Sequence, residues 1–153
     1  MSSLESLASS ADTLASALRP ILPSARPERF HTLVTRLRDE LGVAGSAGLW
    51  LASAPGRTEL AGNHTDHNRG RVLAASVALD SIAAVARRDD GVVRLASEGF
   101  PLVEVDVTDT SVRETERETT AALVRGMAAG FVRDGFDVCG FDATARSTVL
   151  AGS

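Results

Sequence analysis

A polar segment near the middle of the chain carries the side chains that could do chemistry. Arg57 and residues 63–66 stand between an apolar stretch that ends at Ala54 and another that begins at Val72. Amide, imidazole, hydroxyl and carboxylate groups suit a polyhydroxylated ligand, because each ligand hydroxyl both donates and accepts hydrogen bonds. A guanidinium group adds a permanent charge and a fork of donors that matches phosphate oxygens. The mixed run consists of Asn63, His64, Thr65 and Asp66.

Proline and glycine punctuate this segment. We expect Pro55-Gly56 to break the preceding strand, so that Arg57 leaves the ladder of backbone hydrogen bonds. Gly62 comes directly before the polar run, where glycine permits a positive φ or the close approach of a ligand to the backbone. The pattern therefore predicts a loop that presents polar groups.

Two other interpretations of the segment are open. Asn, Asp, Thr and Gly are ordinary turn residues, so the loop could be structural or merely solvated. A metal site could be made from His64, Asp66 and His67. Near-adjacent residues rarely converge on one ion without a separate ligand, however, so we predict no metal site in this chain.

The spacing of the segment is similar to a known family signature. Residues 55–70 follow the pattern PGRxxLxGxHTDxNxG, which resembles the signature near the N-terminus of galactokinases, members of the GHMP family of small-molecule kinases. The likeness continues more loosely through residues 72–75, 124–126, 135–137 and 149–153. The resemblance implies an α+β fold, the GHMP-kinase N-terminal domain of the ribosomal protein S5 domain 2-like kind, truncated before the phosphate loop.

The resemblance also implies a role for each matched side chain. Arg57 would lie near the phosphoryl group in flight and stabilise its charge. His64 and Asp66 would hydrogen-bond sugar hydroxyls together with Asn63, and Thr65 would shape the loop between them. The implied reaction is ATP-dependent phosphorylation of galactose at its anomeric hydroxyl, so galactose is the expected small-molecule partner.

Two positions depart from the family pattern. Asn63 stands where the family usually has Glu, and Glu59 stands where it usually has Asn. The exchange keeps the charge of the loop while its hydrogen-bond directions need not stay the same, which bears on how the terminal hydroxyl of the sugar is held. Another GHMP sugar kinase is therefore an alternative. His67 replaces the usual Tyr, and we interpret it as a surface loop histidine.

The last residues of the chain resemble the opening of the family's glycine- and serine-rich phosphate loop. Gly152 and Ser153 are accordingly the candidate nucleotide-binding residues. Such a loop works because backbone N–H groups and the positive end of a helix converge on the anion. The rest of the loop, the catalytic aspartate and the magnesium ligands would lie beyond residue 153. The resemblance thus implies ATP and Mg²⁺ for the full-length enzyme and a nearly inert N-terminal fragment here.

The pattern divides the chain into a helical segment, residues 1–45, and an incomplete GHMP-kinase N-terminal domain, residues 46–153. Apolar residues at helical spacing predict one helix over residues 2–18. A second helix is expected from Pro27, which suits a first turn, to a stop at Gly42. We expect these helices to cover the core of their own domain.

The period then changes from helix to strand. We expect strands over residues 47–54, 71–80 and 103–107. Residues 82–88 and 92–96 flank an Asp-Asp-Gly turn, which predicts a hairpin. These strands are expected to form the scaffold of the domain.

The last part of the chain is predicted to form a loop, a helix and a strand. Residues 108–118 are polar, and the helix after them is expected to end at Gly135. Cys139 is expected to be a small buried hydrophobe. We expect the strand that contains Phe141 to lack neighbours and so to be an exposed edge. The expected inner face of the helix comprises Leu123, Val124, Met127, Ala128 and Phe131.

The composition argues against several classes of function. A formal charge of -4 leaves no basic footprint for nucleic acid. The single cysteine fits a reducing compartment, and no apolar stretch approaches the length of a membrane span. We expect a cytoplasmic protein without nucleic-acid or membrane partners, and the sequence leaves its oligomeric state open.

Two classes of function fit these residues. The first is the N-terminal part of a galactokinase-like kinase. The second is a non-catalytic galactose-binding or regulatory module that keeps the sugar loop without the chemistry. Arg57 favours the first, because the resemblance places it against the phosphoryl group and not against the sugar.

Overall fold

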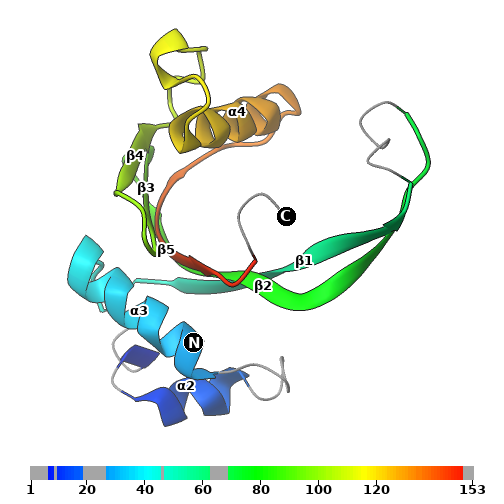
Figure 1. Ribbon diagram of the computed structural model, residues 1–153. Helices are drawn as coiled ribbons and strands as arrows, with labels where there is room; N and C mark the ends of the chain where they lie inside the picture. The colour runs from blue at the N-terminus through cyan, green and yellow to red at the C-terminus, as the bar shows by residue number, and fades with distance from the viewer. Residues whose placement is uncertain (1–6, 9, 19–26, 46, 63–68, 150–153) are drawn as a thin grey trace.

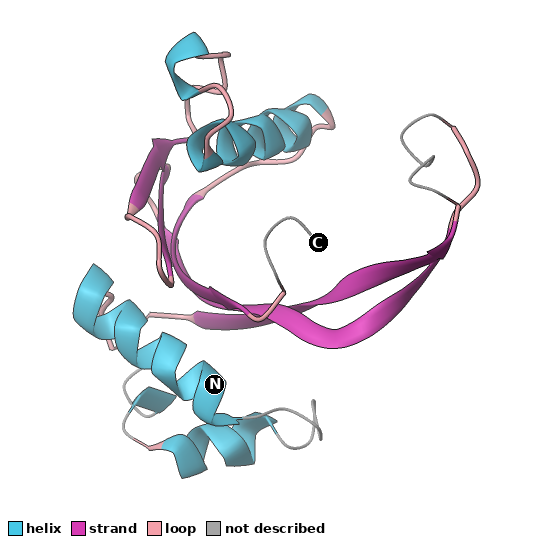
Figure 2. Ribbon diagram, viewed as in Figure 1, coloured by secondary structure: helices cyan, strands magenta, loops and turns pink. Residues whose placement is uncertain are grey.

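The computed structural model describes residues 7–8, 10–18, 27–45, 47–62 and 69–149. Its elements are α2 (Ala11–Leu18), α3 (Pro27–Leu41), β1 (Leu49–Ala61), β2 (Leu73–Arg88), β3 (Val92–Ser97), β4 (Val103–Asp106), the 3-10 helix η2 (Glu114–Glu116), α4 (Thr120–Arg133) and β5 (Gly140–Ser147). The strands form one five-stranded sheet in the order β1-β2-β5-β3-β4. The sheet is strongly curved, and the long β1–β2 hairpin extends away from the rest of the fold (Figure 1). Helices α2 and α3 lie on its convex side, whereas α4 lies on the concave side (Figure 2).

The second predicted helix is confirmed as α3. It begins at Pro27, where the lack of an N–H costs nothing because the N–H groups of a first turn have no acceptor within the helix. It ends before Gly42, which has a φ of 66°. Its buried side packs on the sheet, where the Oγ1 of Thr144 donates a hydrogen bond to the carbonyl oxygen of Leu33 at 2.8 Å. One core cluster joins the N-terminal helices to β2, and it includes Leu14, Leu18, Phe30, Leu33, Val34, Leu37, Leu41, Ile82, Ala84 and Ala86.

The connection between β2 and β3 differs from the predicted hairpin. The chain does reverse at the Asp-Asp-Gly turn, where Gly91 has a φ of 70° and the Asp90 carboxylate accepts a hydrogen bond from the N–H of Val92 at 3.1 Å. Strand β5, however, lies between β2 and β3, antiparallel to the first and parallel to the second. Turn residues specify only the reversal, so the predicted hairpin was wrong. The expectation that the last strand lacks neighbours was wrong too, because β5 is paired on both sides.

The predicted break at Pro55-Gly56 was also wrong. Strand β1 continues through these residues, with a shift of register between Pro55, which pairs with Asp80, and Arg57, which pairs with Ser76. An irregularity of this kind accommodates a proline, which has no N–H to donate, and β1 is an edge strand, where proline is tolerated. Arg57 therefore stays within β1.

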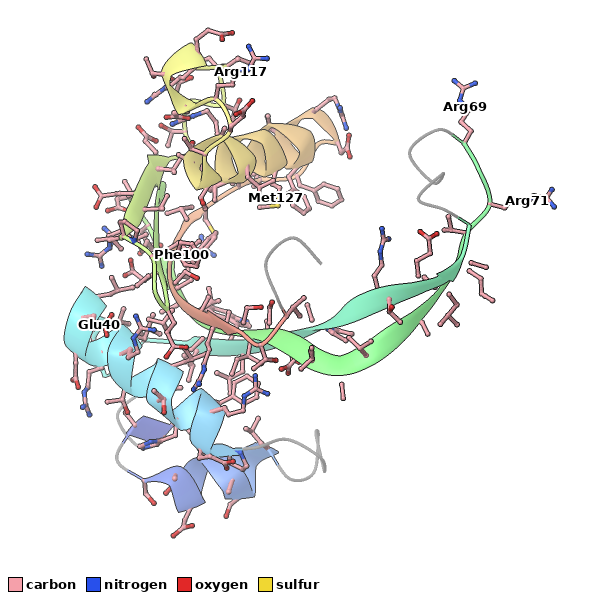
Figure 3. The ribbon with its side chains drawn as sticks, viewed as in Figure 1. Glu40, Arg69, Arg71, Phe100, Arg117 and Met127 are labelled. Atoms are coloured by element: carbon pink, nitrogen blue, oxygen red, sulfur yellow. The ribbon has the colours of Figure 1, made fainter. Side chains whose placement is uncertain are left out.

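Helix α4 packs on the sheet with a narrower face than the one predicted. Val124 and Ala128 are buried in a cluster with valines of β3 and β4, whereas Leu123, Met127 and Phe131 are 63%, 53% and 57% exposed. Figure 3 shows Met127 pointing toward the concave side of the sheet. Apolar residues occupy a wider face of α4 than the face that the sheet covers. Their spacing alone therefore could not decide which of them are buried.

Helix α4 is tied to the preceding loop by a buried arginine. The guanidinium of Arg125, only 4% exposed, donates to the two carboxylate oxygens of Glu116 at 2.8 and 2.9 Å. It also donates to the carbonyl oxygen of Asp106 at 2.7 Å and to that of Asp109. The predicted loop over residues 108–118 is confirmed apart from the single turn of η2.

Cys139 is exposed, so the prediction that it is a buried hydrophobe was wrong. It directly precedes β5 and belongs to neither of the core clusters formed by the described residues. A small apolar side chain favours burial, but nothing in the local pattern of a connecting segment decides which residue reaches the core.

Candidate functional site

In the sequence, the predicted sugar loop falls between the end of β1 at Ala61 and the start of β2 at Leu73. Residues 63–68 and 150–153 lie outside the described residues. Arg57 is the predicted site residue that the structure places. The predicted site residues outside the described part of the chain are Asn63, His64, Thr65, Asp66, Gly152 and Ser153.

The base of the loop is closed by a contact that requires glycine. Gly62 has a φ of 132°, and a Cβ built there would lie 2.6 Å from the Cγ1 of Val72 and 2.9 Å from the carbonyl oxygen of Arg71. Any side chain would overlap these atoms, so the positive φ predicted for Gly62 is confirmed together with a close approach of backbone to backbone. Arg69 and Arg71 project from the tip of the hairpin away from the rest of the chain (Figure 3).

Arg57 lies on β1 directly after the irregularity, opposite Ser76, and its side chain is exposed. The preceding residue, Gly56, is tightly enclosed. A Cβ built on it would lie 3.0 Å from the Cγ2 of Val149 and 3.1 Å from the Cγ2 of Val77. Val149 is the last residue that the structure describes. The fold therefore brings Val149 against the strand that carries Arg57.

A polar network beside this point links three elements. The Asp80 carboxylate on β2 accepts hydrogen bonds from the Nη2 of Arg29 on α3 at 2.7 Å and from the Oγ of Ser53 on β1 at 3.0 Å. Thr148, which directly follows β5, accepts a hydrogen bond from the N–H of Asp80 at 3.0 Å. The N–H of Thr148 in turn donates to the carbonyl oxygen of Asp80 at 2.9 Å. Because Asp80 pairs with Pro55, the network lies next to the irregularity of β1.

The network keeps the Asp80 carboxylate charged. The hydrogen bond from Arg29 holds the pKa of Asp80 below its ordinary value of 3.8, although desolvation acts in the opposite direction. The hydrogen bond from Ser53 lowers the pKa further. Asp80 was not among the residues predicted from the sequence, where the available signal was a single carboxylate within the apolar run from residue 72 to residue 86.

Other candidate sites lie apart from Arg57. The described residues contain no group of three His, Cys, Asp or Glu side chains that could hold a metal ion. A cavity of about 370 Å³ lies between the loop at residues 110–118 and α4, and Arg125 lines it. None of the helices in the described ranges is both long enough and apolar enough to cross a membrane.

The sequence around Arg57 matches a known family. Residues 38–87 match the family model described as the galactokinase galactose-binding signature. That range contains Arg57, residues 63–66 and Asp80. The predicted resemblance at residues 55–70 is therefore confirmed.

Curated galactokinases are similar to this chain over much of its length. The galactokinase of Streptomyces coelicolor is 33% identical over 122 residues, which cover 80% of this chain and 31% of that protein. The galactokinase of Bacillus subtilis is 35% identical over 116 residues, which cover 69% of this chain and 29% of that protein. The chain thus spans about a third of the length of the curated relatives it matches.

Solved structures of kinases share the fold. The Lactococcus lactis galactokinase complexed with galactose matches with a TM-score of 0.63 and 27% identity, over 77% of this chain and 31% of that one. The Methanococcus jannaschii mevalonate kinase matches with a TM-score of 0.53 over 69% of this chain and 34% of that one, and at 10% identity it supports the fold alone. The predicted α+β fold is confirmed. Signature and fold agree, and the chain is a member of the GHMP kinase family that is related to the N-terminal part of galactokinases.

Proposed function

We propose that this chain supplies the galactose-binding part of a galactokinase-like enzyme, which phosphorylates the anomeric hydroxyl of galactose with ATP. The observation that carries this proposal is the match of residues 38–87 to the galactose-binding signature. It is supported by the likeness to a galactokinase whose solved structure contains galactose. The close contact of Gly62 with Val72 directly precedes the predicted sugar-binding residues in the sequence.

The proposal gives Arg57 and the loop separate tasks. Residues 63–66 hold the sugar hydroxyls and so orient the anomeric oxygen for attack. Arg57 stabilises the negative charge of the phosphoryl group during its transfer. Its place on β1, next to the residue that contacts Val149, supports this task because the segment after Val149 resembles the start of a phosphate loop.

ATP and Mg²⁺ belong to the reaction at the level of the family. Within the described residues the guanidinium of Arg57 fits phosphate oxygens, whereas no group of three metal-ligating side chains is present. Gly152 and Ser153 remain the proposed start of the nucleotide site. Because phosphoryl transfer depends on charge stabilisation around metal and phosphates, we propose that this chain alone does not reach ordinary kinase rates.

The test transfers residues 38–87 into the galactokinase of Bacillus subtilis in place of its own matching segment. We expect the chimera to consume ATP when galactose is added. Within the chimera, Arg57→Ala should lower kcat about a hundredfold and leave the KM for galactose unchanged, because its charge acts in the transition state. Asp66→Ala should instead raise that KM, because it removes a contact to the sugar. Steady-state kinetics at saturating ATP measure both constants.

The matched control is Arg69→Ala. Arg69 belongs to the same hairpin but is not one of the predicted site residues, so its substitution should leave kcat and the KM for galactose unchanged. A chimera that folds and binds nucleotide but does not respond to galactose would contradict the proposal. Calorimetric titration of the chain itself with galactose tests the alternative. Millimolar or tighter binding without ATP, together with a chimera whose kcat is unchanged by Arg57→Ala, would favour a non-catalytic galactose-binding module.

A further inference from the structure

The cavity of about 370 Å³ between the loop at residues 110–118 and α4 belongs to a different side of the molecule from Arg57. In Figure 3, Arg117 of this loop and Met127 lie on opposite sides of α4. The cavity is therefore distinct from the exposed apolar side of the helix. None of the residues that line it belongs to the predicted sugar or phosphate site. The lining from α4 includes the small residues Ala122, Gly126 and Ala129.

One wall of the cavity is a fixed ion pair. Arg125, which is 4% exposed, donates to both carboxylate oxygens of Glu116 and to the backbone carbonyl oxygens of Asp106 and Asp109. The hydrogen bond from Arg125 holds the pKa of Glu116 below its ordinary value of 4.5. Because these two charges satisfy each other, neither needs a ligand as a partner. The pair shapes the cavity and does not determine the charge of a ligand.

Gly126 leaves room in the cavity that packing does not require. A Cβ built on it would meet no atom within 4 Å, and the residue lies inside α4, where glycine is less stable than alanine. Gly130 of the same helix also has open space at its Cβ position, but it does not line the cavity. At Gly126 the helix therefore carries a destabilising residue whose visible effect is to keep the cavity open.

The unpaired charges around the cavity are of both signs. Arg113 is paired with Asp109 at 2.8 Å, whereas one guanidinium and two carboxylates of the lining have no partner in the part of the chain that the structure describes. A purely anionic ligand would meet the two carboxylates, and a purely cationic one would meet the guanidinium. A ligand that carries both charges can pair with each kind of group. The unpaired residues are Glu114, Arg117 and Glu118.

We propose that this cavity binds a small zwitterion with an apolar side chain, of the chemical class of the apolar α-amino acids. Arg117 pairs with its carboxylate, and Glu114 and Glu118 pair with its ammonium group. The apolar side chain lies between Val112 of the loop and the small residues of α4. The volume fits such a ligand, because small-molecule sites begin at about 300 Å³. The site is independent of the proposed function, since none of its residues has a part in it.

The experiment titrates L-phenylalanine into the isotope-labelled full chain and follows the backbone amide signals by NMR. We expect the amides of residues 110–118 and of Gly126 to shift and those of β1 to stay unchanged. Two analogues test the charges, because phenylpropionate lacks the ammonium group and phenethylamine lacks the carboxylate. Each analogue should bind about tenfold more weakly than phenylalanine, since one charge-assisted interaction is missing.

Gly126→Leu and Gly130→Leu form a matched pair of variants. Each replaces a helix glycine by a better helix former where the Cβ has space, so each should raise the urea midpoint. Only Gly126→Leu places a side chain at the cavity, so it should abolish the binding of phenylalanine. Gly130→Leu should bind as the wild type does. Equal binding by the two variants would overturn the proposal.

Arg117→Gln tests the charge without depending on the core, because Arg117 is exposed. It should remove the advantage of phenylalanine over phenethylamine, whereas Arg133→Gln, at the far end of α4 and outside the cavity, should keep it. Equal binding of the three ligands to the wild type, or no response to phenylalanine, would contradict a zwitterion site. Shifts at Leu123 and Met127 instead of the loop would mean adsorption to the apolar side of α4 and would overturn the proposal as well.

Discussion

At position 62 the backbone conformation and the neighbouring atoms both require glycine. We predict that Gly62→Ala lowers the free energy of unfolding by about 2 kcal/mol, since a positive φ is strained for alanine and its Cβ overlaps Val72. Because the overlap is at the base of the sugar loop, the same substitution in the chimera should raise the KM for galactose. Urea denaturation and steady-state kinetics measure the two effects.

Gly99 provides the matched control for this substitution. It has a φ of 82°, but no atom lies within 4 Å of a Cβ built there. Gly99→Ala in this chain should therefore lower the free energy of unfolding by only about 1 kcal/mol, which is the cost of backbone strain alone. Equal effects of the two substitutions would show that the contact with Val72 is unimportant.

The conformation of a single residue was predictable from the sequence where the chemistry of its residue type determines it. The positive φ of Gly62 and the stop at Gly42 follow from properties of glycine alone. The role of Asp80 could not be predicted, because Arg29 and Thr148 reach it only after strands far apart in the chain have paired. The residues of the sugar loop itself, 63–66, remain predicted rather than observed.

Among the elements, β5 depends on a buried carboxylate. Asp142, 6% exposed, accepts hydrogen bonds from Arg94 on β3 at 2.6 and 2.8 Å and from Arg88 on β2 at 3.2 Å. Arg94 also donates to the carbonyl oxygen of Leu41 at the end of α3. Removal of the carboxylate leaves two guanidinium groups without their shared partner. We predict that Asp142→Ala lowers the free energy of unfolding by about 3 kcal/mol.

Urea denaturation measures this loss, and Asp137→Ala is the control. Asp137 is exposed in the connection that precedes β5. Its substitution should change the free energy of unfolding by less than about 0.5 kcal/mol. A loss for Asp142→Ala as small as that of the control would mean that water replaces the carboxylate without cost.

The ends of a helix or strand were predictable where residues at those ends determine them. They were not predictable where pairing with another strand determines them. The bounds of α3 follow from Pro27 and Gly42. The continuation of β1 past Pro55 depends on β2, which supplies a partner on the far side of the irregularity. The separation of β2 from β3 depends on β5, and no turn residue encodes the insertion of a strand from the end of the chain.

The molecule as a whole should lose stability in acid. Arg88 holds the pKa of Asp90 at about 2, and Arg125 holds the pKa of Glu116 below its ordinary value of 4.5. The pKa of Asp80 is lowered as well, chiefly by the hydrogen bond from Arg29. A carboxyl with a lower pKa in the folded chain stabilises that state above the unfolded pKa and loses this contribution as the pH falls through the folded one.

We therefore predict that the urea midpoint is nearly constant from about pH 7 to pH 5 and falls between about pH 4.5 and pH 2. Asp80→Asn should be less stable than the wild type at neutral pH and should lose less on acidification, because one of the responsible carboxyl groups is gone. An equal midpoint at about pH 7 and pH 3 in the wild type would contradict this account.

The uncovered apolar side of α4 has a practical consequence for anyone who handles this chain. Leu123, Met127 and Phe131 give extrinsic fluorophores such as anilinonaphthalene sulfonate a place to adsorb before any heating. Melting curves followed with such a dye will then start from a raised fluorescence baseline and underestimate the amplitude of the unfolding transition. Scanning calorimetry, or the intrinsic emission of the single tryptophan at position 50, avoids that artefact.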